Sequence, residues 1–325
     1  MVRPFQLSDI PLLTRLEKSG VPLYNEVALT HGLHPWRSAL AGYLSLHRHG
    51  LHTCVLPASQ AGGGFAQMWP RQERGVMTYI APALSGNEPG AVWVELLEAM
   101  AVVAGKLGLQ YLIAEVPGES PAIDVLRHAG FSIYLRQDIL RCVPGPACSE
   151  KLTDPTLLHK ASPSDEWAVQ QLYYNITPRL AQLASFVPEI KPASQVYIAQ
   201  DAGEVTTYLE IRPGALGAWF DVMVHPQAEV HAQHALIHGL ALMGQQSERA
   251  LYCCVRRYQE WLWEPLLALG FEAFASSAVM VKRLVAPVTE PELSPVAALE
   301  ARQAASPVAR AATSDPLRAT SRAGE

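Results

Sequence analysis

The sequence predicts an α+β protein with two tandem domains, each a mixed, mostly antiparallel sheet flanked by helices, followed by a disordered C-terminal tail. Three observations predict this class. Landmarks recur 140 positions apart, as in Gly130-Phe131 and Gly270-Phe271, so the second half repeats the first. Each half has a meander of strands and then a strand, helix, strand, helix, strand order, which is typical of a mixed sheet. Residues 286–325 contain no aromatic residue and no sustained apolar period, which is typical of disorder.

Composition and charge argue against several classes of protein. The chain has 325 residues, enough for about two domains. Its formal charge of -5 lacks the basic excess of nucleic-acid-binding proteins, so we expect no nucleic-acid partner. No apolar run reaches the length of a spanning helix, and the N-terminus does not resemble a secretory signal, so we expect a cytoplasmic protein with no membrane partner. Five cysteines without CxxC spacing argue against a disulfide framework and against a cysteine zinc site.

A change of composition divides the two halves. Three prolines and a glycine interrupt the apolar pattern over residues 143–155, which is typical of a linker. The predicted organisation is therefore a first domain, a linker, a second domain and a tail, with the boundaries 1–145, 146–156, 157–285 and 286–325.

Each half opens on an amphipathic helix that follows a Ser-Asp pair. Residues 5–16 contain Ser8 and Asp9, and residues 161–172 contain Ser164 and Asp165. Their side-chain oxygens can cap the free N–H groups of the helix that follows.

The remaining elements follow in the same order in both halves. Each half ends on a helix closed by Gly and followed at once by a strand, over residues 126–139 and 266–279. In the first half we expect strands at 51–56, 65–69 and 76–80, a helix at 91–107, a strand at 111–116 and a helix at 121–129. In the second half we expect strands at 195–200, 206–211 and 218–224, a helix at 231–245, a strand at 250–255 and a helix at 258–269.

This order, found twice, resembles the GCN5-related N-acetyltransferase family over about residues 1–285. The matching landmarks are the opening Ser-Asp helices, the helix-Gly-Phe-strand endings, and Val224-His225-Pro226 and Ile80-Ala81-Pro82 after the two fourth strands. The resemblance implies that the fourth and fifth strands splay apart and that acetyl-CoA inserts between them. It also implies that N–H groups at the start of the next helix hold the pyrophosphate.

Both cofactor loops depart from the family pattern, which has Gly-x-Gly. The first half has SGNEPGA at 85–91, and the second has QAEVHAQ at 227–233, so Glu88 or Glu229 would lie near a pyrophosphate. The cofactor-binding residues that the resemblance implies in the second half are Met223, Val224, Ala228, Val230, His231 and Ala232. Those that it implies in the first half are Ile80, Gly86, Gly90 and Ala91.

Two carboxylates are candidates for the base that removes the amine proton in the family's reaction. Asp221 lies on the fourth strand of the second half, where the family often places such a group, and it could instead only bind a neighbouring loop. Glu115, on the fifth strand of the first half, is the weaker candidate. The tyrosine that protonates the leaving thiolate in many members is replaced by Leu126 and Leu266.

Aromatic residues on the acceptor side suggest substrate contacts. Tyr173, Tyr174 and Trp36 lie in the regions that form the acceptor wall in the resembled family. His231, His234 and His238 share one face of a predicted helix, but no carboxylate or Cys stands at ligand spacing, so we expect no metal site.

The resemblance therefore predicts an N-acetyltransferase-like protein that moves an acetyl or acyl group from acetyl-CoA to an amine of a small molecule or peptide. The second domain is the better candidate for the chemistry, and neither the acceptor nor the oligomeric state is indicated by the residues. The alternative is a catalytically inactive module of the same fold that binds CoA, a metabolite or a protein partner, which the altered loops and the missing tyrosines favour.

Overall fold

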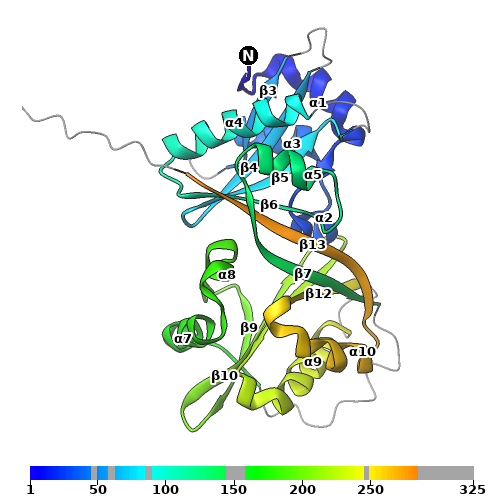
Figure 1. The fold of residues 1–325 in the computed structure, drawn as a ribbon. Coiled ribbons are helices and arrows are strands. Elements are labelled where there is room, and N and C mark those ends of the chain that lie inside the picture. The colour runs from blue at the N-terminus through cyan, green and yellow to red at the C-terminus, as the bar shows by residue number, and fades with distance from the viewer. Residues whose placement is uncertain (45–49, 58–62, 85–89, 144–157, 245–248, 285–325) are drawn as a thin grey trace, which may run out of the picture. The chain divides into compact units, whose positions relative to one another are not determined.

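A computed structural model describes residues 1–44, 50–57, 63–84, 90–143, 158–244 and 249–284. The strands of these residues form one 13-stranded sheet (Figure 1). The predicted linker, Gly86 and the predicted tail lie outside the described residues.

The first half has helices on both faces of its strands. Its helices are α1 (Ile10–Leu16), α2 (Asn25–Thr30), α3 (Pro35–Leu44), α4 (Ala91–Lys106) and α5 (Ala122–His128), with short 3-10 turns η1 (Leu7–Asp9) and η2 (Glu17–Ser19). Its strands are β1 (Arg3–Pro4), β2 (Val21–Pro22), β3 (His52–Leu56), β4 (Gly64–Arg71), β5 (Arg74–Ala81), β6 (Tyr111–Pro117) and β7 (Ser132–Cys142).

The second half repeats this order. Its helices are α7 (Glu166–Ile176), α8 (Arg179–Ala184), α9 (Glu229–Gly244) and α10 (Trp263–Ala268), with 3-10 turns η3 (Pro163–Asp165), η4 (Pro226–Ala228) and η5 (Arg257–Leu262). Its strands are β8 (His159–Lys160), β9 (Gln195–Asp201), β10 (Glu204–Pro213), β11 (Gly217–Val224), β12 (Ala250–Arg256) and β13 (Glu272–Arg283). The α+β class and the flanking helices agree with the sequence prediction.

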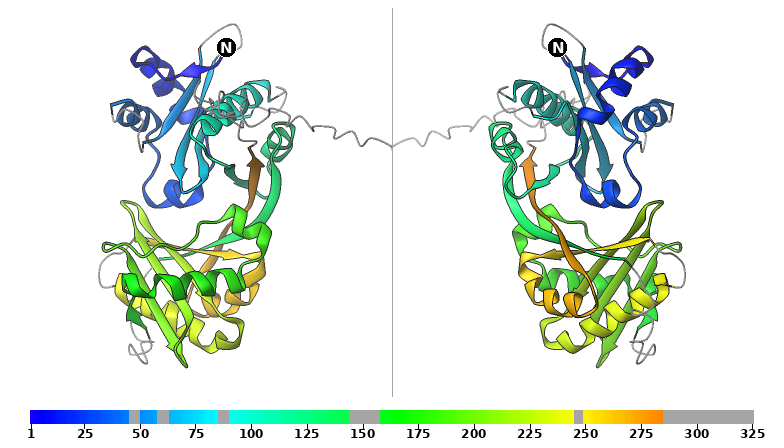
Figure 2. Two further views of the ribbon diagram at one scale, coloured as in Figure 1. Left: turned by 90° about the vertical axis from the view of Figure 1, so that its left-hand side faces the viewer. Right: turned by 90° about the vertical axis from the view of Figure 1, so that its right-hand side faces the viewer.

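The last strands of the two halves are exchanged. The strand β7 of the first half pairs with β12 of the second, and β13 of the second half pairs with β6 of the first. Between them β7 and β13 pair with each other, and Figure 2 shows the two strands running side by side. The halves are therefore joined into one sheet, and each takes its last strand from the other.

Alternating side chains divide the residues of each strand between two apolar layers. On β3, Cys54 and Leu56 pack under α4, whereas Val55 between them packs with α1 and α3. The exchange carries side chains into the partner half: Met280 of β13 belongs to the core under α4 and α5, and Leu140 of β7 belongs to the core under α9 and α10.

One predicted helix is wrong in part. We expected a single helix over 258–269, but the chain forms η5 and then α10, with Gln259 outside helical geometry at φ -121°. Pro265 has no N–H group, so it is tolerated only in the first turn of a helix, and α10 begins two residues before it.

No helix within the described ranges combines the length and the apolar character that a membrane crossing requires.

The exchange predicts that a change in β13 weakens the first half. The Met280 side chain is fully buried, so Met280→Ala should lower the free energy of unfolding by about 2–5 kcal/mol. Hydrogen exchange should show the loss of protection in β6 and α4, which belong to the first half. The control is Glu272→Ala, at an exposed position of the same strand. Loss of protection in α9 and α10 alone would contradict the exchange.

Candidate functional site

A polar cavity of about 110 Å³ lies on the sheet of the second half. Its floor is formed by alternate residues of three neighbouring strands, because every second side chain of a strand points to the same face. These residues are Tyr208, Glu210 and Arg212 on β10, Trp219, Asp221 and Met223 on β11, and Cys254 and Arg256 on β12.

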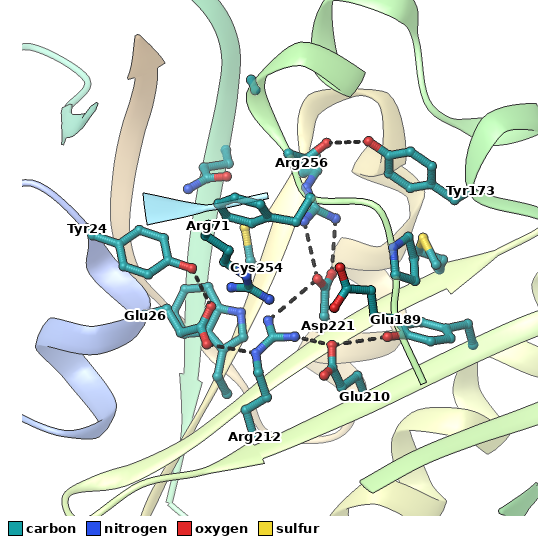
Figure 3. A pocket seen from close by; sticks show the side chains of 18 of the residues that line it. Tyr24, Glu26, Arg71, Tyr173, Glu189, Glu210, Arg212, Asp221, Cys254 and Arg256 are labelled. Carbon is teal, nitrogen blue, oxygen red and sulfur yellow. Dashed lines mark hydrogen bonds and ion pairs between the residues drawn. The ribbon is translucent and has the colours of Figure 1, made fainter. Parts of the chain in front are cut away.

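Ion pairs hold the charged residues of this floor together (Figure 3). Glu210 and Asp221 stand directly opposite each other on β10 and β11, where two carboxylates repel. Arg256 donates to Asp221 over 3.0 Å, and Arg212 pairs with Glu210 and lies 3.6 Å from Asp221. The two guanidinium groups therefore compensate the repulsion.

The first half closes the cavity with the chain around α2. Arg212 Nε donates to Glu26 Oε1 over 2.7 Å, and the Tyr24 hydroxyl donates to Glu26 Oε2 over 2.7 Å. The turn after β10 approaches the end of α2 so closely that a Cβ at Gly214 would lie 2.3 Å from the carbonyl oxygen of Thr30. Glycine is needed at this turn, because any side chain would push α2 and its Glu26 away.

The segment 19–25 occupies the gap between the fourth and fifth strands of the first half. The strands β5 and β6 pair over only three positions, from Arg74↔Tyr111 to Val76↔Ile113. Beyond them, Leu23 N–H donates to Thr78 O over 3.0 Å, and Glu115 N–H donates to Leu23 O over 2.8 Å. Backbone groups on both strand edges are therefore already bonded by the protein's own chain.

Glu115 reaches the cavity from the edge of this filled gap. Its Oε2 accepts a hydrogen bond from the backbone N–H of Asn25 over 2.8 Å. Burial raises the pKa of Glu115 from 4.5 to about 7, although the hydrogen bond from Asn25 lowers it and the charge of Glu26 raises it further. A carboxyl group with this pKa can both accept and release a proton near neutral pH.

Asp221 has the opposite electrostatic environment. Burial raises the pKa of its carboxyl group, but the guanidinium groups of Arg256 and Arg212 outweigh burial and hold the pKa below its usual range. Asp221 therefore stays ionised at neutral pH, with both of its oxygens engaged by Arg256.

The gap in the second half is filled differently. Strands β11 and β12 pair over four positions, from Gly217↔Ala250 to Phe220↔Cys253. Beyond them a side chain crosses instead of a backbone: Gln259 Nε2 donates to Val222 O over 3.3 Å. The buried Oε1 of Gln259 has no hydrogen-bond partner among the described residues.

The structure brings some of the sequence-predicted site residues together. Asp221, Glu115, Met223 and Tyr173 all line the cavity, and the Tyr173 hydroxyl lies 3.0 Å from the Ser185 hydroxyl. The side chain of Tyr174 is 52% exposed, and it is not among the described residues that line the cavity.

The other predicted residues lie elsewhere. Trp36 packs against the apolar cluster of α1 and α3. Ile80 stands opposite Val21 in the filled gap. Gly90 and Ala91 lie at the start of α4, Val224 ends β11, Ala228 ends η4, and Val230, His231 and Ala232 are in the first turns of α9.

The described part of the chain contains no cluster of three or more His, Cys, Asp or Glu side chains that could hold a metal ion. The ring of His238 lies 5.2 Å from that of Tyr197, and burial lowers the pKa of His238.

The sequence did not indicate six further charged residues of the cavity, namely Glu26, Arg71, Glu189, Lys191, Glu210 and Arg212. A signal existed for two of them. Glu210 and Arg212 alternate with Tyr208 along a strand of otherwise apolar pattern, which places three polar groups on one face. Glu26 and Arg71 come from the first half, and no local pattern links them to β10.

Comparisons with known proteins find similarity in structure. No protein-family model matches the sequence, and no curated protein matches it. A GCN5-related N-acetyltransferase from Sphaerobacter thermophilus is 14% identical with a TM-score of 0.54, over 87% of this chain and 95% of that one. A tandem GNAT protein from the clavulanic acid biosynthesis pathway, solved without AcCoA, is 14% identical with a TM-score of 0.50, over 88% and 98%. A putative acetyltransferase from Pyrococcus horikoshii is 10% identical with a TM-score of 0.50, over 87% and 89%.

The raised pKa of Glu115 predicts a pH-dependent stability. The folded protein holds the Glu115 proton more tightly than the unfolded chain, so this group favours folding below its unfolded pKa, and the contribution is lost as the pH rises toward 7. Glu115→Gln removes this dependence. Relative to the variant, the wild type should lose up to about 3 kcal/mol of unfolding free energy between about pH 4 and about pH 8.

Urea unfolding at a series of pH values measures this difference. Glu119→Gln, at an exposed position, is the control and should follow the wild type. A difference between wild type and Glu115→Gln that stays constant with pH would show that Glu115 titrates normally.

Proposed function

We propose that this chain, which has the fold of the GCN5-related N-acetyltransferases, transfers an acetyl group from acetyl-CoA to the amine of a small molecule. The observation that carries the proposal is the Glu115 carboxyl group, whose pKa of about 7 suits a general base, in a cavity beside the gap between β11 and β12. The cavity volume of about 110 Å³ corresponds to a few water molecules, which favours a small acceptor.

The second half is the better place for acetyl-CoA. In the first half, the edges of β5 and β6 already bond to the segment 19–25. In the second half, the bonds that the described residues make across the gap come from side chains, Gln259 to Val222 and Arg256 to Asp221, and a side chain can move aside more easily than a strand.

The residues of the second half fit this co-substrate. The unpartnered Oε1 of Gln259 is a buried acceptor that an amide N–H of the pantetheine arm can satisfy. The helix α9, 16 residues long, begins directly after η4, so its N-terminal N–H groups suit a pyrophosphate. Ala228, Val230, His231 and Ala232 lie at this junction, and Met223 and Val224 lie on the strand that leads to it.

The two predicted catalytic carboxylates then have different roles. Acetyl-CoA, when bound, supplies the acyl group as an activated thioester. Glu115 accepts the proton that the attacking amine loses, because its carboxylate and acid forms are both populated near neutral pH. The amide bond forms as the thioester C–S bond breaks, and the CoA thiolate that leaves takes up a proton from water. Asp221 remains ionised, fixes Arg256 and Arg212, and gives the floor a permanent charge pattern that orients the acceptor.

A catalytically inactive binding module is the weaker interpretation. A carboxyl group with a pKa near 7 is expected where protons are exchanged during turnover, whereas binding alone is served by charges that stay fixed, like Asp221.

Glu115→Gln should lower kcat by roughly 10² to 10⁴ and leave the Kd of acetyl-CoA unchanged, because only the base is removed. In the wild type, kcat/KM should rise with pH through about 7, since the ionised carboxylate is the reactive form. The measurement is release of the CoA thiol against pH, with Glu119→Gln as the control. If kcat/KM of Glu115→Gln still rises with pH through about 7, another group is the base.

Calorimetry should find one acetyl-CoA per chain, because the gap between β5 and β6 is bonded by backbone, whereas the gap between β11 and β12 is crossed by side chains that can move. Gln259→Leu, which removes the unpartnered acceptor, should weaken acetyl-CoA binding about tenfold or more. The control is Gln200→Leu on β9, at an exposed position. Two results would contradict the placement of acetyl-CoA between β11 and β12. One is a stoichiometry of two acetyl-CoA per chain. The other is an unchanged affinity for acetyl-CoA in a Gln259→Leu protein that still unfolds cooperatively.

A further inference from the structure

We propose that Arg71 binds a carboxylate group of the acceptor, so that the acceptor is a small amino carboxylate, such as an amino acid. This inference rests on the proposed function and names the substrate class of the same site. Arg71 is the last residue of β4 and lines the cavity together with Glu115.

The neighbours of Arg71 have structural partners in the second half. Gln72 donates to Val187 O and to Glu189 Oε1, over 3.0 and 2.9 Å. Arg74 donates to Leu183 O and Gln182 O, over 3.2 and 2.8 Å. The turn after β4 is thus already anchored without Arg71.

The Arg71 side chain makes no hydrogen bond or ion pair with any described residue. Burial raises the pKa of Tyr24 and the hydrogen bond from Gln72 lowers that of Glu189, and in both cases the charge of Arg71 makes a smaller contribution that lowers the pKa. Its guanidinium lies 4.2 Å from the ring centroid of Phe186, so the side chain is held against an aromatic face while its N–H donors stay available. Figure 3 shows Arg71 in the cavity near Tyr24 and Asp221.

The other cations of the lining are neutralised by the protein. Arg212 pairs with Glu26, Glu210 and Asp221, and Arg256 pairs with Asp221. Lys191 pairs with Glu189 over 3.0 Å. Among the described lining residues, Arg71 is therefore the cation left for an anion of the ligand.

The charge of the cavity selects a carboxylate over a phosphate. Five carboxylates line it, namely Glu26, Glu115, Glu189, Glu210 and Asp221, against the four cations Arg71, Lys191, Arg212 and Arg256. A phosphate dianion would meet more repulsion than attraction in this cavity. A zwitterion places one negative charge on the planar fork of Arg71 and brings its amine toward the acidic side of the cavity.

Calorimetric titration of the full chain tests this inference. Each proteinogenic amino acid is titrated, and its affinity is compared with that of its carboxamide, which lacks the carboxylate charge. At least one amino acid should bind ten- to a hundredfold more tightly than its carboxamide. Arg71→Met keeps the apolar stem over Phe186 and should bring that ratio close to one. Arg127→Met, an exposed arginine on α5, should leave the ratio unchanged.

The outcomes separate this inference from the proposed function. If no amino acid binds more tightly than its carboxamide, or if the ratio survives in Arg71→Met, the carboxylate site is wrong even when acetyl-CoA binds. The protein could instead prefer carboxylates through Arg71 and fail to bind acetyl-CoA. That result would support the carboxylate site at Arg71 and contradict the proposed acetyl transfer.

Discussion

The two hydrogen bonds that the Leu23 backbone makes, one to β5 and one to β6, organise the rest of the site. They bond the facing edges of β5 and β6, so the gap of the first half is filled by the protein's own chain. The same segment continues into Tyr24 and Glu26, which line the cavity, and into Asn25, whose backbone N–H binds Glu115. One short segment thus fills the gap of the first half with backbone and joins that half to the charged residues of the second.

The exchange of β7 and β13 allows residues of the first half to line the cavity of the second half. Because β13 lies between β6 and β7, Glu115 of β6 belongs to the same sheet as the charged floor of β10, β11 and β12. Buried ion pairs contribute little net stability, since desolvation offsets their attraction. Their value in this fold is geometric: Arg212 on β10 joins Glu26 on α2 of one half to Glu210 and Asp221 on the strands of the other, so these charged groups are held in fixed relative positions.

The sequence predicted the repeated order of elements, because strand alternation and Gly-ended helices are local patterns. Four of the candidate site residues that it indicated, Asp221, Glu115, Met223 and Tyr173, line the cavity. The sequence could not predict the exchange, since β7 and β13 are long strands of similar character and both pairings satisfy the same local pattern. The filled gap was missed because β2 is two residues long and contains Pro22, which lacks an N–H donor and argues against a strand. Arg71 and Glu26 were missed because their partners lie more than a hundred residues away.

We propose that acetyl-CoA enters between β11 and β12 and not between β5 and β6. Hydrogen exchange of the full chain with and without acetyl-CoA tests it most directly. We expect new protection in residues 221–232 and in the segment around Gln259, with residues 19–25 and 74–81 unchanged. Protection or release in residues 19–25, with no change in 221–232, would show that the segment leaves the first gap and that the active half is the first.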